Sequence, residues 1–186
     1  PFEQSFREAI FMVVSIVTTT GYVTADYTSW APGLTILFFG LIFVGGCAGS
    51  TAGGIKIIRH VAFVKNTILE FKRLMHPNAI IPLKLNGSIV RGRVKTHILV
   101  FLLLYLGTFI IGTIIVAAFG LDFTTSMGAV ATSISNVGPA IGAVGPVDNF
   151  AHLPDAVKWI LTFLMLLGRL ELYTILILFT SYFWRF

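Results

Sequence analysis

Charged residues are scarce in this chain, and their scarcity limits the kind of protein that it can be. Only 11% of the 186 residues are Asp, Glu, Lys or Arg, whereas 56% are hydrophobic. A soluble domain carries roughly 25% charged residues, so this chain has too little charge to cover a surface that faces water. The composition excludes an ordinary globular domain and predicts an integral membrane protein.

Cysteine is nearly absent as well. The single Cys47 excludes an internal disulfide and a metal site built from several cysteines. It lies among glycines in an apolar segment, so we expect a buried, unreactive thiol. No arrangement of a nucleophile and a base is present in the sequence, so we do not expect an enzyme.

Three segments are long and apolar enough to cross a bilayer, which requires about 20 residues. They run from about 35 to 58, from 97 to 119 and from 157 to 183. Two further apolar segments, 4–17 and 123–135, are too short to span. They fit re-entrant pore helices, whose ends need protein or a water-filled cavity around them.

Basic residues gather in one connector between the first two spans. Nine of the 13 Lys and Arg residues, Arg91 included, lie between Lys56 and Lys95, and Glu70 is the only acid there. The positive-inside rule places this connector in the cytoplasm, where we expect a solvated loop. A solvated loop could also contact anionic lipid or an acidic partner. We do not expect it to bind nucleic acid, because no aromatic residues are interleaved with the basic ones as in known nucleic-acid-binding modules.

Acidic residues fall on the opposite side of the expected topology. There they would give cations a mildly negative entrance. These residues are Glu3, Glu8, Asp26, Asp122, Asp148 and Asp155.

The most informative pattern occurs twice. Residues 18–23 (the first glycine segment, TTTGYV) and residues 135–140 (the second glycine segment, SNVGPA) each follow a short apolar run and precede a long span. With Gly21 aligned on Gly138, Ser15 aligns with Thr132 without a gap. A short helix, a turn centred on glycine and a membrane helix together are typical of a pore loop.

The chemistry of these segments favours a monovalent cation. K⁺ enters a pore when backbone carbonyls replace its hydration shell, and glycine permits the dihedral angles that this requires. Few carboxylates are nearby, which argues against Ca²⁺ or Mg²⁺. The alternative is that Gly21 and Gly138 merely end helices. One filter needs four such strands and this chain has two, so the others must come from further sequence or a second chain.

A glycine-rich loop (residues 45–54) interrupts the first span with Gly45, Gly46, Gly49, Gly53 and Gly54. Each glycine weakens a helix by about 1 kcal/mol relative to alanine. An unwound segment at membrane depth is tolerated where it lines a cavity, so we expect a gate below the filter. Close packing of helices through small residues is the alternative.

Arg169 and Glu171 lie near the middle of the third span. A charge at the bilayer centre costs about 2.5–3.5 kcal/mol on insertion scales, so such groups usually face a pore or a partner. We expect Arg169 to reach the cavity below the filter, where it would repel cations or bind carbonyls of the glycine-rich loop. A structural contact with a neighbouring helix is the alternative.

Together these motifs resemble the Trk/Ktr/HKT superfamily of potassium transporters, and most closely its bacterial Trk-type membrane subunit. The resemblance rests on residues 18–22, 45–56, 135–139 and 168–171 and covers essentially the whole chain. It implies an all-α integral membrane fold of repeated helix–pore loop–helix units, as in K⁺ channels, with re-entrant pore helices. Residues 1–87 would hold most of the third repeat and residues 88–186 the fourth, within a longer protein.

The resemblance also implies potassium uptake across the cytoplasmic membrane, with K⁺ as the transported ligand and no organic cofactor. The glycine-rich loop would be the intramembrane gate and Arg169 the pore arginine. Family members form homodimers in membrane lipid, and a cytosolic nucleotide-binding subunit regulates them. The filter positions that carry over are Thr19, Thr20, Gly21, Tyr22, Asn136, Val137, Gly138 and Pro139.

Two other functional classes stay open. One is a secondary transporter with its substrate site at the broken helix, although that class uses broken full spans rather than duplicated short helices. The other is a non-transporting structural membrane subunit. Symport with H⁺ or Na⁺ and simple flow through a channel are both compatible with the sequence.

Overall fold

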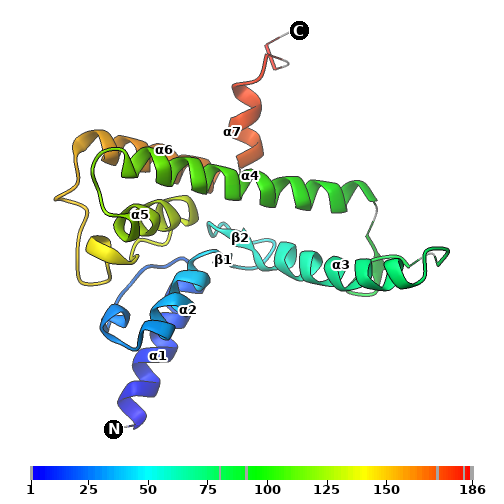
Figure 1. Cartoon of the computed structure of the whole chain (residues 1–186). Coiled ribbons are helices and arrows are strands. Elements are labelled where there is room, and N and C mark those ends of the chain that lie inside the picture. The colour runs from blue at the N-terminus through cyan, green and yellow to red at the C-terminus, as the bar shows by residue number, and fades with distance from the viewer. Residues whose placement is uncertain (1, 80, 91, 171, 182, 185–186) are drawn as a thin grey trace.

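The computed structural model describes residues 2–79, 81–90, 92–170, 172–181 and 183–184. Within these ranges the chain is mostly helical (Figure 1). Arg91, which we assigned to the basic connector, and Glu171, which we placed in the third span, lie outside the described residues.

The first half of the chain begins with two helices joined by a short turn. These are α1 (Phe2–Val17), the 3₁₀ helix η1 (Tyr27–Ser29) and α2 (Pro32–Ile42). Asp26 caps η1, because its carboxylate accepts a hydrogen bond from the Thr28 amide at 2.9 Å. α2 begins with Pro32, whose missing N–H is not needed in the first turn. A short helix therefore lies where the first pore helix was predicted.

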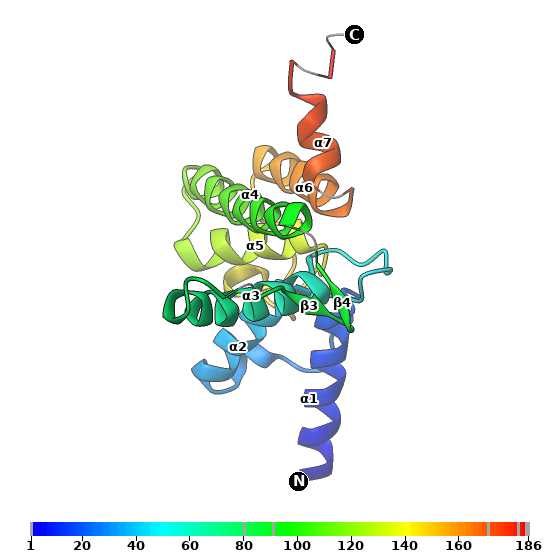
Figure 2. The same cartoon turned by 90° about the vertical axis from the view of Figure 1, so that its right-hand side faces the viewer.

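The first predicted span is broken at its glycines. α2 ends at Ile42, and the next helix, α3 (Ile57–Met75), begins only after the glycine-rich loop. At the two ends of the loop, β1 (Val44–Gly45) pairs in parallel with β2 (Ile55–Lys56), which an all-α fold did not predict. Cys47 is exposed in the loop. The prediction of a buried thiol is wrong because the tip of the loop leaves the packed helices (Figure 2).

The basic connector is not the loop that we predicted. α3 fills about half of it, because no Gly or Pro interrupts the sequence from Ile57 to Met75. A hairpin of β3 (Lys84–Leu85) and β4 (Ser88–Ile89) follows. Its two turn residues, Asn86 and Gly87, have φ values of 48° and 79°, as a two-residue hairpin turn requires.

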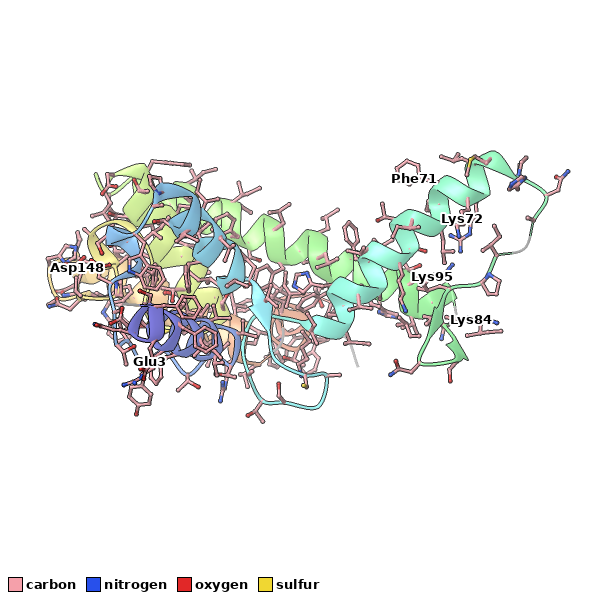
Figure 3. The ribbon with its side chains drawn as sticks, turned by 90° about the horizontal axis from the view of Figure 1, so that it is seen from below. Glu3, Phe71, Lys72, Lys84, Lys95 and Asp148 are labelled. Atoms are coloured by element: carbon pink, nitrogen blue, oxygen red, sulfur yellow. The ribbon has the colours of Figure 1, made fainter. Side chains whose placement is uncertain are left out.

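Several lysines of the basic connector and two of the acidic residues lie at opposite ends of the molecule. Figure 3 shows Lys72, Lys84 and Lys95 gathered at one end, whereas Glu3 and Asp148 lie at the other. This separation agrees with the assignment of basic and acidic residues to different sides of a membrane.

The second half contains α4 (Gly92–Ala117), α5 (Phe123–Ser135), the 3₁₀ helix η2 (Gly142–Val144), α6 (Asp155–Arg169) and α7 (Leu172–Leu178). Helix α5 packs against both α4 and α6, and α7 projects away from them (Figure 1). Among the described helices, α4 alone is long and apolar enough to cross a membrane. The short helix predicted at 123–135 is present as α5.

The third predicted span is not one helix. α6 ends at Arg169, and α7 begins at Leu172 with an axis inclined by 113°. Together the two helices are long and apolar enough to cross a membrane, as one broken span or as a re-entrant loop, so the span from 157 to 183 stays a prediction. Gly168, Arg169 and Glu171 lie at this break in the sequence, but we interpreted the two charges as groups that face a pore or a partner and not as the end of a helix.

Two apolar clusters hold the structure together, and both contain residues from the two halves. The first lies mainly among α4, α5 and α6 and includes Ile55 of β2. In the second, Met12, Ile16 and Phe38 from the first half pack with Val137 and Ile141 from the second. The core of the first half therefore extends to the second glycine segment.

Candidate functional site

The two glycine segments begin with the same backbone construction. Thr19 and Asn136 both adopt the left-handed conformation, with φ of 57° and 56°. The amide of each donates to the carbonyl three residues earlier, at 3.0 Å and 3.2 Å. The following amides, of Thr20 and Val137, return to the carbonyl five residues earlier, at 2.9 Å and 3.1 Å. Segments aligned by sequence therefore also have the same hydrogen bonds.

Gly21 and Gly138 follow with positive φ values of 77° and 114°. Residues with a Cβ rarely adopt such angles. The left-handed residue that ends each helix is Thr19 or Asn136, and the glycine lies two positions further along. The alternative that the glycines simply end the helices does not fit this geometry.

The structure brings the two glycine segments into direct contact. A Cβ on Gly21 would lie 2.1 Å from the carbonyl oxygen of Val137 and 3.4 Å from Cδ of Pro139. A Cβ on Gly138, by contrast, would meet no atom within 4 Å. Tyr22 is mostly exposed. Backbones that are far apart in the sequence thus share one site, which is open beside Gly138.

Hydrogen bonds with residues of three other elements hold the second glycine segment in place. The Asn136 side-chain amide donates to the Met165 carbonyl in α6 at 3.1 Å. The Tyr105 hydroxyl of α4 is 2.7 Å from the Ser135 hydroxyl. The Tyr27 hydroxyl of η1 donates to the Ala140 carbonyl at 2.6 Å. This segment is therefore embedded in the protein.

The glycine-rich loop lies against the end of α5. A Cβ on Gly53 would be 2.2 Å from the Ser135 carbonyl oxygen, and one on Gly45 would be 2.4 Å from the Gly53 carbonyl oxygen. Side chains are excluded at both positions. Gly54 has φ of 70°, and only Gly49 has open space around it. The base of this loop is thus in close backbone contact, and Gly53 lies directly beside the second glycine segment.

The loop is also held by a residue that the sequence did not single out. The Lys56 ammonium donates to the Ala48 carbonyl at 3.2 Å and to the Ser50 carbonyl at 3.0 Å. In the sequence Lys56 belonged to the basic connector and ended the motif 45–56 that carries the family resemblance, but no role was assigned to its side chain. Its position directly after a loop rich in unpaired carbonyls is the signal that could have identified it. Tyr27 was missed too, and its partner is too distant in sequence for any local signal.

A small cavity of about 50 Å³ separates the glycine-rich loop from the end of α6. Ser50, Thr51 and Arg169 are among the residues that line it. A Cβ on Gly168 would lie only 1.8 Å from the Ile134 carbonyl oxygen, so α6 ends directly against the last turn of α5. Arg169 therefore shares a cavity with the loop that it was expected to reach.

An acidic cap lies at the opposite end of α5. The Asp122 carboxylate accepts a hydrogen bond from the Thr125 amide at 3.0 Å. Bonds from the Thr125 side chain and backbone hold the pKa of Asp122 below its ordinary value. The carboxylate therefore stays charged in mild acid, next to the positive end of the helix dipole.

Comparison with known proteins identifies the family. A family model described as "Cation transport protein" (TrkH) matches residues 1–184. The potassium uptake protein TrkH of Halomonas elongata is 41% identical over 98% of this chain, and TrkH of Escherichia coli K12 is 39% identical over 97%. In each case the chain spans 37% of the relative's length.

A solved structure indicates the same family. The crystal structure of the potassium transporter TrkH from Vibrio parahaemolyticus superposes with a TM-score of 0.91, at 39% identity, over 98% of this chain and 39% of that one. The chain therefore belongs to the TrkH family of cation transport proteins, which are multi-pass proteins of the bacterial inner membrane.

Proposed function

We propose that this chain forms part of a potassium uptake pore, in which residues 19–22 and 136–139 contribute to one selectivity filter. The observation that carries the proposal is the contact between Gly21 and the Val137 carbonyl, where a Cβ would come within 2.1 Å. It brings two segments of the same backbone geometry to one place. The relatives with about 40% identity are named potassium uptake proteins.

The chemistry of the filter follows from the backbone. Carbonyl oxygens of the glycine segments would replace part of the hydration shell of K⁺. The open side of Gly138 is where an ion has room. With two of four strands in this chain, residues 1–87 would form the third pore repeat and residues 88–186 the fourth.

The remaining repeats would lie beside α1. This helix leaves Phe6, Ile10 and Val14 more than half exposed, whereas most residues of α5 are buried. An apolar face of this kind is stable when other membrane segments cover it. The TrkH relatives from Halomonas elongata and Escherichia coli are more than twice as long as this chain, so they have enough additional sequence to supply such segments.

The glycine-rich loop and Arg169 would form the gate. The loop touches the end of α5 through Gly53 and shares a cavity with Arg169. Backbone carbonyls of the loop attract cations, whereas a guanidinium repels them. An unwound loop of this kind can move aside without unfolding a helix, and that movement would open the path.

Replacing Lys56 by methionine should raise the K⁺ flux. The change removes the two hydrogen bonds from the charged ammonium to the Ala48 and Ser50 carbonyls, which hold the tip of the loop. The loop should then leave the closed position more often. K⁺ uptake at equal protein amounts measures this effect. Lys65→Met, on the exposed surface of α3, is the matched control, and an equal flux in both variants would argue against a role for Lys56.

We also propose the partners that the family resemblance implies. The basic end, with Lys72, Lys84 and Lys95 (Figure 3), would face the cytoplasm, where it could contact anionic lipid or an acidic surface of a nucleotide-binding regulatory subunit. The complete protein would act as a homodimer.

Growth of a potassium-deficient bacterial strain tests the proposed function. Cells that express the full-length protein should grow at low external K⁺, and growth that stays at the level of the empty vector would favour a non-transporting subunit. Single-channel recordings then separate the pore from a secondary transporter. We expect unitary currents, because a continuous pore passes many ions per opening.

A further inference from the structure

The backbone of Ala140, at the end of the second glycine segment, is unusually well fixed. Its amide donates to the Val144 carbonyl at 3.0 Å. Its carbonyl accepts the Tyr27 hydroxyl at 2.6 Å. Ala140 is fully buried, so water cannot replace either partner. These two bonds set the orientation of the peptide that directly follows the proposed filter position Pro139.

The first half of the chain holds Tyr27 rigidly. Its side chain is fully buried, and its ring stacks on Phe38 with a centroid distance of 4.9 Å and an interplanar angle of 13°. Asp26 caps the short helix that carries it. A close-packed ring of this kind keeps its hydroxyl in one place, so the hydrogen bond to Ala140 couples the two halves at the filter.

The first glycine segment has no equivalent dependence. Its Tyr22 carbonyl accepts a hydrogen bond from the Ser15 hydroxyl at 2.7 Å, within the same helix–turn unit. The alignment of Gly21 with Gly138 places Val144 opposite Tyr27, and valine has no hydroxyl to donate. Each segment is therefore held by its own helix, since the Gly138 amide donates to the Thr132 hydroxyl at 2.7 Å. The second segment is held in addition by a tyrosine of the preceding repeat.

We propose that Tyr27 is a positioning residue that fixes the second filter segment and thereby sets the preference for K⁺ over Na⁺. The inference rests on the proposed function. Tyr27 does not contact the ion. Its hydroxyl keeps the Ala140 carbonyl turned into the protein, so that the preceding carbonyls, from Asn136 to Gly138, keep one arrangement. Selectivity depends on the number and placement of such oxygens.

The test is Tyr27→Phe in the full-length protein, with permeability ratios taken from reversal potentials in K⁺ and Na⁺. The ring remains, so packing on Phe38 is retained, and only the hydroxyl is lost. The Ala140 carbonyl is then left buried without a donor, so the K⁺/Na⁺ permeability ratio should fall by about fivefold, which corresponds to about 1 kcal/mol. The matched control is Tyr173→Phe, whose hydroxyl donates to the His97 carbonyl at 2.9 Å on the exposed surface, and its ratio should not change.

A permeability ratio does not depend on the number of channels in the membrane, so lower expression cannot imitate the expected result. Phe38→Leu offers a second variant, because it loosens the support of the Tyr27 ring and should shift the ratio in the same direction by a smaller factor. Unchanged ratios in both variants, with a wild type that conducts K⁺, overturn this inference alone. A wild type without K⁺ current overturns the proposed function and this inference with it.

Discussion

Replacing Gly21 by serine should remove most of the preference for K⁺ over Na⁺. Gly21 has φ of 77°, and a residue with a Cβ loses about 1–2 kcal/mol in that conformation. The new Cβ would also lie 2.1 Å from the Val137 carbonyl oxygen. Because that neighbour is backbone, the second glycine segment must move. One substitution therefore disturbs both segments.

We expect the K⁺/Na⁺ permeability ratio of Gly21→Ser to fall by about tenfold or more, the factor that corresponds to about 1.4 kcal/mol. Reversal potentials of the full-length protein measure this ratio. Gly33→Ser is the matched control, since a Cβ there meets no atom within 4 Å and its φ is not left-handed. A Gly21→Ser permeability ratio equal to that of the wild type would contradict the assignment of Gly21 to the filter.

Shortening the glycine-rich loop should raise the maximal rate of K⁺ uptake several-fold. The pairing of β1 with β2 brings the two ends of the loop together, and the Gly45 backbone touches that of Gly53. A deletion of residues 47–52 can therefore be closed without moving α2 or α3. It removes the carbonyls that Lys56 holds and the chain that lines the cavity beside Arg169.

The filter should not be affected by this deletion, so the K⁺ concentration at half-maximal uptake should stay the same while the maximal rate rises. Initial rates of K⁺ or Rb⁺ uptake, normalised to protein amount, separate these two quantities. Gly49→Ala is the control, because Gly49 has open space around it. A deletion variant with less uptake than the wild type would contradict the role of the loop as a gate.

Patterns that recur locally made part of this structure predictable. The two short helices lie where apolar runs of limited length predicted them, because such runs cannot span a bilayer. The glycines at positions 21 and 138 have positive φ, as a turned backbone requires. The break in the first span follows from its five glycines, since each of them weakens a helix.

Features that depend on tertiary contacts could not be predicted in this way. Hydropathy does not distinguish a loop from the amphipathic helix α3. The charges at Arg169 and Glu171 predicted a pore-facing or partner-facing site, and not the division between α6 and α7. The left-handed residue after each helix is Thr19 or Asn136 rather than glycine. Tyr27 acts on Ala140, and no local sequence pattern connects residues so far apart.

The central claim is that the two glycine segments contribute to one ion path, and the position of a bound ion tests it most directly. The measurement is a crystallographic map of the full-length protein with Rb⁺ or Tl⁺ in place of K⁺, in which anomalous scattering locates the ion. We predict a peak within coordinating distance of carbonyl oxygens from residues 19–22 and from residues 136–139. A peak that contacts neither segment, or only one of them, would contradict the account.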